Sequence, residues 1–155
     1  MKRIKPEKIH LLGATVLKMN INPTQEFLEL REEPDNMTVG FSQESRFDFD
    51  EGIVLIVLEI KLTGKDQDEK DIGLEGNYSI EFTFKIDNFN EFIVEKKETT
   101  DNKEVTTRQV DGILGGTLMG IAYSTARGII LERTQGTLLG DNGVIIPVIN
   151  PNELL

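Results

Sequence analysis

One stretch of alternating apolar residues constrains the fold more than any other part of this chain. From residue 72 to residue 87, apolar side chains occupy every second position, with only Gly76 interrupting them, and polar or small residues lie between. The apolar positions are Ile72, Leu74, Tyr78, Ile80, Phe82, Phe84 and Ile86. A period of two over this length is typical of a strand with one buried and one solvated face. The pattern therefore predicts a long antiparallel strand.

Three further segments predict strands that join the first one in a single sheet. The polar connection GKDQDEK favours a hairpin with residues 53–62, which place Glu59 and Lys61 on one face and, on the core face, Val54, Ile56, Leu58, Ile60 and Leu62. A less regular strand carries its apolar residues at odd positions, namely Val39, Phe41, Phe47 and Phe49. Residues 9–21 predict another strand, apolar on both faces, which indicates that a further surface covers it. Together these segments predict a four-stranded antiparallel sheet in an α+β fold.

After residue 110 the apolar spacing changes to three and four, which predicts helix. The apolar positions are Val110, Ile113, Leu114, Leu118, Ile121, Ala122, Ala126, Ile129 and Ile130. Each glycine in this segment weakens a free helix by up to about 1 kcal/mol relative to alanine. We therefore predict two helices with a break near Gly120, the second ending at Gly136, although the glycines could instead mark loops. A turn over 140–143 and an apolar run over 144–149 follow.

The charged segment 95–104, EKKETTDNKE, is interpreted as a mobile loop between the sheet and the helices. At 155 residues the chain has the length of one domain, and we expect residues 1–155 to form it. Such a chain is long enough to bury its own core.

The net charge of −10 limits the classes of partner. Nucleic acids and anionic membranes would be repelled by such a surface, so basic or neutral polypeptides fit better. The chain has no cysteine, which excludes disulfides and thiolate metal sites. The basic start MKRIKPEKIHLL lacks the apolar run and cleavage site of a signal peptide, and no segment of about 20 apolar residues follows. We therefore expect a cytoplasmic protein.

Residues that could support catalysis are few. His10 is the only histidine and has no nucleophile near it in the sequence. The acidic run at 65–71 lacks the central glycine and closing glutamate of a calcium-binding loop, so a solvated turn is the better interpretation. Asp48 and Asp50 share a strand face without an evident pocket. The glycines near Gly115 do not follow a strand as a dinucleotide site requires. The sequence therefore predicts no catalytic residue, metal or cofactor.

The order of elements and several short motifs resemble the SecB family of protein-export chaperones. Ala126 and Arg127 match the opening of the family's second helix, and Gly136 and Thr137 match its end. The tail is similar to the family's proline-valine-asparagine ending through Pro147, Val148, Asn150 and Leu154. The stretch MTVGFSQESRFDFDEGIVLIVLEIKLTG follows the family's second and third strands in length and polarity. The resemblance covers about residues 8–155.

This resemblance implies a cytoplasmic, ATP-independent holdase that assembles as a dimer of dimers and holds unfolded or precursor polypeptides in apolar grooves. It implies no cofactor. The residues that would line the client groove are Leu12, Val16, Phe41, Phe47, Phe49 and Phe92. Packing between helices implies an oligomer interface at Ile113, Leu114 and Leu118. Glu75 falls near one acidic position of the face with which the family binds its translocase motor, SecA.

Leu17 and Ile21 depart from the family pattern, because they stand where the family has acidic residues. The chain also ends without the family's polar tail. Binding to the motor therefore stays open, as does a dedicated role beside a toxin–antitoxin pair. Two other classes are also open: a small-ligand-binding or enzymatic domain with an enclosed pocket on a concave sheet face, and a structural oligomer whose apolar surfaces are all interface.

Overall fold

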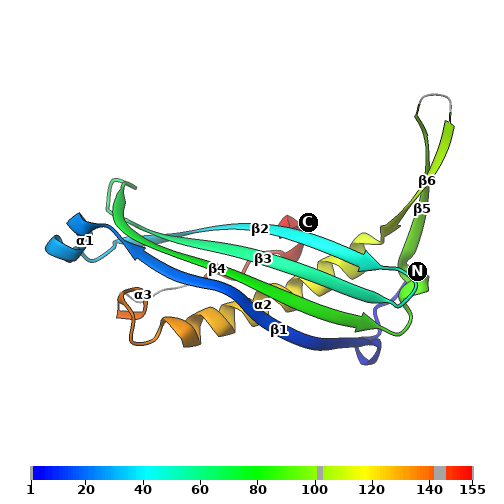
Figure 1. Cartoon of the computed structure of the whole chain (residues 1–155), viewed down its shortest axis with the longest axis horizontal. Coiled ribbons are helices and arrows are strands. Elements are labelled where there is room, and N and C mark those ends of the chain that lie inside the picture. The colour runs from blue at the N-terminus through cyan, green and yellow to red at the C-terminus, as the bar shows by residue number, and fades with distance from the viewer. Residues whose placement is uncertain (1, 101–102, 142–145, 155) are drawn as a thin grey trace.

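A four-stranded antiparallel sheet with one long helix across one of its faces forms the body of the molecule (Figure 1). The computed structural model describes residues 2–100, 103–141 and 146–154. The bounds of these elements are β1 Ile9–Pro23, β2 Asn36–Asp48, β3 Ile53–Lys65, β4 Asp71–Ile86 and α2 Gly112–Thr134. In the sheet the strands lie in the order β1-β4-β3-β2. The predicted α+β fold and its four antiparallel strands are therefore confirmed.

The shorter elements lie at the two ends of the sheet, except for η3, which lies against α2 and β2. They are η1 Pro6–Lys8, α1 Gln25–Leu30, η2 Phe89–Phe92, β5 Ile93–Thr100, β6 Lys103–Val110, α3 Leu138–Asp141 and η3 Pro151–Leu154. Figure 1 shows α1 at one end, and at the other the antiparallel pair of β5 and β6, which extends away from the sheet. Of the helices that the structure describes, none has the length and apolar character needed to cross a membrane.

The core lies between α2 and one face of the sheet. Residues directly opposite each other in an antiparallel sheet share a face, and Ile56 lies opposite Phe82 in the register of β3 and β4. Apart from Ile72, the even-numbered apolar residues of both strands are only 0–3 % exposed. They are Val54, Ile56, Leu58, Ile60 and Leu62 of β3 and Leu74, Tyr78, Ile80, Phe82, Phe84 and Ile86 of β4. The alternation in the sequence thus corresponds to one buried face.

The start of β4 departs from this alternation. Gly73 has a φ of +83°, and the register between β3 and β4 shifts between Thr63 and Lys65. Ile72, which the pattern assigns to the buried face, is only half-buried there. The backbone oxygen of Gly73 accepts a hydrogen bond of 2.8 Å from the backbone N–H of Thr24. This irregular start of β4 therefore anchors the segment that leads into α1.

The edge strand β1 contains two β-bulges, which explain why it is apolar on both faces. Its register with β4 shifts between Leu11 and Gly13 and again between Val16 and Lys18. Each extra residue at such a shift turns the strand and leaves a side chain outside the regular alternation. Leu12 and Leu17 occupy these positions and are 60 % and 54 % exposed. Within the described chain, the expected covering surface does not enclose these side chains.

The predicted helix break near Gly120 is wrong, because α2 continues without interruption from Gly112 to Thr134. One row of buried side chains recurs every fourth residue and packs against the sheet; it consists of Leu114, Leu118, Ala122, Ala126 and Ile130, and Met119, Tyr123 and Thr134 beside it are also buried. Full burial of a single leucine contributes about 1.5–3 kcal/mol, more than the ~1 kcal/mol that one glycine costs. The short helix α3 follows after Gly136, whose φ is +73°. Of the predicted turn, Gly140 and Asp141 belong to α3, and residues 142–143 lie outside the described residues.

The segment 95–104 is also not a loop in its described part, because it belongs to the paired strands β5 and β6. β-branched residues dominate these strands and favour an extended backbone. Opposite charges also face each other across them, as Glu95 does Arg108. In sequence order these charges resembled a solvated run. Pairs such as Glu95 and Arg108, more than ten positions apart, become neighbours only when the two strands pair.

Asp111 is the N-cap residue of α2, and its carboxylate makes the stability of the helix dependent on pH. The Oδ1 atom of Asp111 accepts a hydrogen bond of 2.9 Å from the backbone N–H of Ile113, and its Oδ2 atom lies 3.2 Å from Lys2 Nζ. The hydrogen bond from Ile113, and after it Lys2, lower the pKa of Asp111. The ionised form is therefore favoured in the folded state, so its contribution is present above the unfolded-state pKa and is lost as pH falls through the lower folded-state pKa.

We expect Asp111→Ala to lower the thermal unfolding midpoint at pH 7 by about 2–4 °C, because a helix of this length loses its N-cap. As pH falls below about 4 and through the lowered pKa of Asp111, the wild-type carboxylate is progressively protonated, and the difference between the two proteins should shrink. Asp111→Asn keeps the cap without the charge and serves as the control. Thermal melts by circular dichroism between pH 3 and pH 7 test this. A difference that does not change with pH would contradict the role of the charge.

Candidate functional site

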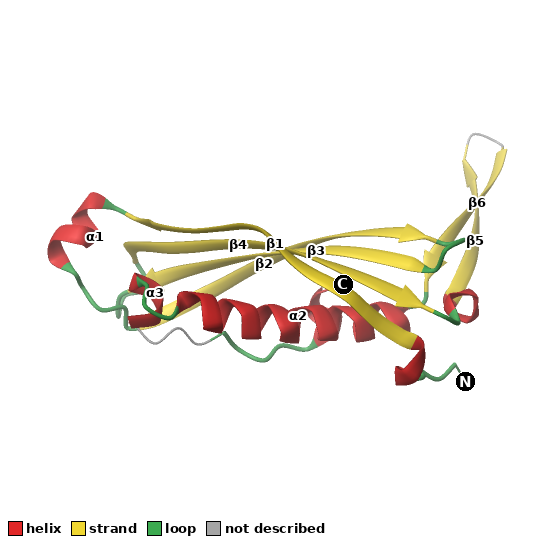
Figure 2. Ribbon diagram, turned by 60° about the horizontal axis from the view of Figure 1, so that its bottom comes forward, coloured by secondary structure: helices red, strands yellow, loops and turns green. Residues whose placement is uncertain are grey.

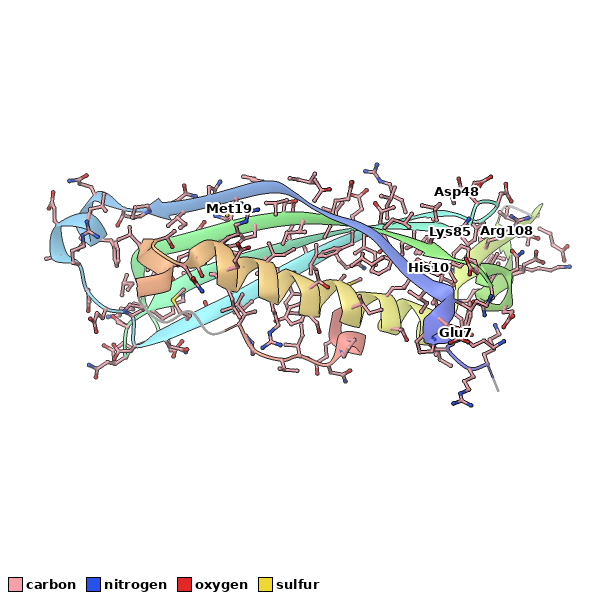
Figure 3. The ribbon with its side chains drawn as sticks, turned by 90° about the horizontal axis from the view of Figure 1, so that it is seen from below. Glu7, His10, Met19, Asp48, Lys85 and Arg108 are labelled. Atoms are coloured by element: carbon pink, nitrogen blue, oxygen red, sulfur yellow. The ribbon has the colours of Figure 1, made fainter. Side chains whose placement is uncertain are left out.

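The helix α2 has two flanks, and the flank toward β1 is an open groove with both apolar and charged side chains in its lining. Residues 14–19 of β1 and the α2 residues Ile129, Glu132 and Arg133 line a hollow of about 650 Å³. Met19 of this strand is 44 % exposed, and Figure 3 shows it on β1 beside the helix. This groove therefore presents apolar surface beside a charged rim.

The other flank of α2, toward β2, is occupied by the chain's own C-terminal segment. Figure 2 shows this segment running beside α2. The hydroxyl of Tyr123 donates a hydrogen bond of 2.8 Å to the backbone oxygen of Pro147, and Arg127 Nε donates one of 3.0 Å to that of Ile146. Burial raises the pKa of Tyr123, so its hydroxyl remains a donor at neutral pH. The ring of Phe41 meets that of Tyr123 edge-on, with centroids 6.3 Å apart.

A third feature is an aromatic cluster at the end of the sheet that carries β5 and β6. The ring of Phe49 lies 5.9 Å from that of Phe47 and stacks on that of Phe89 at 5.7 Å. Beside it, Asp50 Oδ1 and Arg108 Nη1 are 3.7 Å apart. This ion pair connects β6 to the turn between β2 and β3. The same end of the molecule carries His10 and Lys85 (Figure 3).

The predicted client groove is divided between opposite edges of the sheet. Leu12 and Val16 lie on β1, whereas Phe41 and Phe47 lie on β2 and Phe49 just beyond its end, and β4 and β3 run between the two edges. These side chains all retain exposed or half-exposed surface. They cannot form one continuous groove within a single chain.

Phe92 does not fit the prediction of a client groove, because its side chain is 2 % exposed. It belongs to η2, the short helix that connects the sheet to β5, and packs within the core. The sequence showed an apolar cluster around this residue without showing which way the cluster faces. Phe92 therefore contributes to stability and offers no surface to a client.

The predicted oligomer interface also needs correction. Leu114 and Leu118 are 0 % and 1 % exposed, because this side of α2 packs against the chain's own sheet. Ile113, on the opposite side of the helix, is 48 % exposed. An interface on α2 can therefore include Ile113 but not the two leucines. That Ile113 contacts another copy stays a prediction.

Glu75 lies on the polar face of the sheet, away from α2. Its Oε2 atom is 2.8 Å from Lys61 Nζ on the neighbouring strand, and Asn77 Nδ2 donates a hydrogen bond of 2.9 Å to its Oε1 atom. The hydrogen bond from Asn77 and the pairing with Lys61 lower the pKa of Glu75. The carboxylate is thus ionised but already paired with a cation. Its role in binding a motor protein stays a prediction.

The polar residues considered for catalysis have structural partners. His10 Nε2 lies 3.1 Å from Asp87 Oδ2, both at the surface, and joins the start of β1 to the end of β4. Asp48 and Asp66 accept backbone hydrogen bonds within their own turns. The bonds to Asp66 agree with the interpretation of the acidic run at 65–71 as a turn. Within the described ranges, no three His, Asp or Glu side chains converge as metal ligands.

Sequence reasoning did not predict the contacts that Tyr123 and Arg127 make with the tail. A tyrosine and an arginine four positions apart lie on one side of a helix, and Gly116 and Gly120 continue the same line. That spacing was a usable signal for a distinct flank of α2. The partner of this flank, residues 146–151, is separated from it by α3 and could not be read from the pattern.

Comparisons with known proteins identify the fold. No protein-family model matches the sequence, and no curated protein matches it. Among solved structures, the chain is similar to the SecB-like chaperone Rv1957 of Mycobacterium tuberculosis, solved in complex with a ChAD peptide from the antitoxin HigA1 (Rv1956). The TM-score is 0.58 and the identity 9 %, over 93 % of this chain and 91 % of that chain. The protein therefore has a SecB-like fold.

Proposed function

We propose that this protein is an ATP-independent holdase chaperone that binds unfolded polypeptides on the apolar surfaces beside α2. The observation that carries the proposal is the row of exposed apolar side chains along β1, namely Leu11, Leu12, Leu17 and Met19, beside the groove against α2. Monomeric proteins rarely leave such a contiguous apolar surface uncovered unless it binds something. The SecB-like fold and the peptide held by its structural neighbour support a polypeptide as the partner.

Binding would proceed by burial alone, without a covalent step. Each Å² of apolar surface removed from water contributes about 25 cal/mol, and ordering of the flexible client offsets part of this gain. Many weak contacts would therefore share the affinity. The net charge of −10 favours neutral or basic segments and keeps the loaded chaperone soluble.

The proposal includes a homo-oligomer, a dimer of dimers, in the cytoplasm, with precursor proteins among its clients and SecA as a candidate partner. Exposed Ile113 is a side chain that a second copy would cover. A second candidate function is a chaperone dedicated to an antitoxin. It is favoured by one observation, the antitoxin peptide bound to the structural neighbour.

The first test is whether the purified protein, without nucleotide, suppresses aggregation of a chemically denatured, slow-folding protein. We expect suppression at near-stoichiometric ratio, with the oligomer mass read by light scattering in the same samples. Met19→Glu, which places a charge on the helix-facing side of β1, should weaken suppression. Asn20→Glu, one position away on the polar face and outside the lining of the groove, adds the same charge; it is the matched control and should not.

Equal suppression by both variants would exclude the β1 flank as the binding surface. No suppression by well-folded wild-type protein would overturn a general holdase activity. In that case, binding of a single antitoxin by the same sample would favour the dedicated role.

A further inference from the structure

The tail on the β2 flank of α2 is itself a bound polypeptide segment. Residues 146–150 belong to no helix or strand. Val148, Ile149 and Pro151 help to line a hollow of about 590 Å³ against α2. Ile146 anchors the segment and is 2 % exposed. Val148 by contrast is 80 % exposed and contributes almost no contact. The tail therefore fills its site incompletely.

The two hydrogen bonds on this flank do not depend on the sequence of the segment that lies there, whereas the buried side chain of Ile146 adds an apolar contact. Tyr123 and Arg127 donate to the backbone oxygens of consecutive residues, which any polypeptide offers. Gly120 forms part of the floor: a Cβ atom there would lie 3.1 Å from Pro151 Cγ, so the missing side chain admits the incoming chain. Hydrogen-bond donors that contact backbone oxygens beside an apolar surface favour an extended peptide over a compact ligand.

We propose that the β2 flank of α2 is a second polypeptide-binding site, which the chain's own tail occupies until an extended apolar segment of a client displaces it. This inference rests on the proposed holdase function and adds a site to it. The client takes over the hydrogen bonds from Tyr123 and Arg127, and an apolar side chain fills the position that Val148 leaves open. Phe41, edge-on to Tyr123, extends the site onto β2.

A disulfide can lock the tail in place. The Cβ atom that a side chain at Gly120 would have lies 3.5 Å from Pro151 Cβ, at the near end of the ~3.5–4.5 Å range of disulfides. The chain has no cysteine of its own, so the double variant Gly120→Cys/Pro151→Cys carries a single thiol pair. Its oxidised and reduced forms differ only in whether the tail can leave. The single variant Gly120→Cys, treated with the same oxidant, is the control.

The probe is a permanently unfolded protein of basic charge, reduced and carboxamidomethylated pancreatic trypsin inhibitor, with binding measured by fluorescence anisotropy. We expect the oxidised double variant to bind about tenfold more weakly than its reduced form, because the locked tail cannot be displaced. The reduced form has the same side chains with an unlocked tail and is therefore the reference for this comparison. Equal binding by the oxidised and reduced forms would overturn the proposal.

A spin label at Val148→Cys gives a second measurement in a chain with an unlocked tail. Because Val148 is exposed, the label should leave the fold intact. Addition of the probe should sharpen the spectrum as the tail is released, and an unchanged spectrum in the presence of bound probe would contradict displacement. If neither the wild type nor the reduced variant binds the probe, the holdase function fails and this inference with it. If all forms bind equally, the holdase function stands and this site is excluded.

Discussion

Phe82→Ala is expected to lower the free energy of unfolding by about 3–5 kcal/mol, a large part of the 5–15 kcal/mol typical of a domain. The Phe82 side chain is 0 % exposed on β4, a central strand of the sheet. Its neighbours across the sheet are Ile56 on one side and Ala14 on the other. Removing the ring leaves a cavity between the sheet and α2 that neither neighbour is placed to fill.

Urea unfolding measures this effect, because the midpoint should fall while the slope stays constant. Thr83→Ala is the matched control, since Thr83 is the next residue of the same strand and points to the polar face. Its effect should stay below about 1 kcal/mol. If the two variants lose similar stability, the buried face has been assigned wrongly.

Gly73→Ala should destabilise the protein by about 2–3 kcal/mol, an unusual loss for the addition of one methyl group. The φ of +83° at Gly73 disfavours any residue with a Cβ atom. The new Cβ would also collide with the Thr24 hydroxyl. That hydroxyl accepts a hydrogen bond of 3.2 Å from Phe27 N and so caps α1. The substitution therefore strains the backbone of β4 and at the same time displaces the Thr24 hydroxyl that caps α1.

Gly40→Ala separates these effects from the general cost of glycine in a strand. A Cβ atom at Gly40 would meet nothing within 4 Å, and its φ is not positive. Alanine there should leave stability unchanged or raise it by about 0.5–1 kcal/mol. Denaturant unfolding of both variants tests the pair. Similar losses at Gly73 and Gly40 would show that backbone conformation is not the cause.

The strands were predictable because their pattern depends only on neighbouring residues. The alternation from Ile72 to Ile86 reports a buried face directly, and β3 repeats it. The continuity of α2 at Gly120 was not predictable, because it depends on how much surface the helix buries against the sheet. The pairing of β5 with β6 was missed for a similar reason, since Glu95 and Arg108 meet only after the chain turns back.

The sequence predicted that the candidate site consists of exposed apolar residues, but not where these residues lie in the fold. Val16 and Phe41 both carry exposed or half-exposed apolar surface, yet the strand order places them on opposite edges, and strand order is not encoded in local periodicity. Leu114 was assigned to an interface because the sequence shows a helix's apolar stripe without its partner. The contact of Tyr123 with the tail joins distant segments and needed the structure.

The pairing of β1 with β4 has a consequence for how this protein is made. His10 and Asp87 meet across these strands although they are 77 positions apart. At a synthesis rate of about 5–20 residues per second, β1 leaves the ribosome several seconds before β4. The meander β2-β3-β4 closes by short turns and needs no distant partner, so β1 should dock last. During that interval β1, with leucines on both faces, is itself an unfolded apolar segment of the kind that chaperones bind.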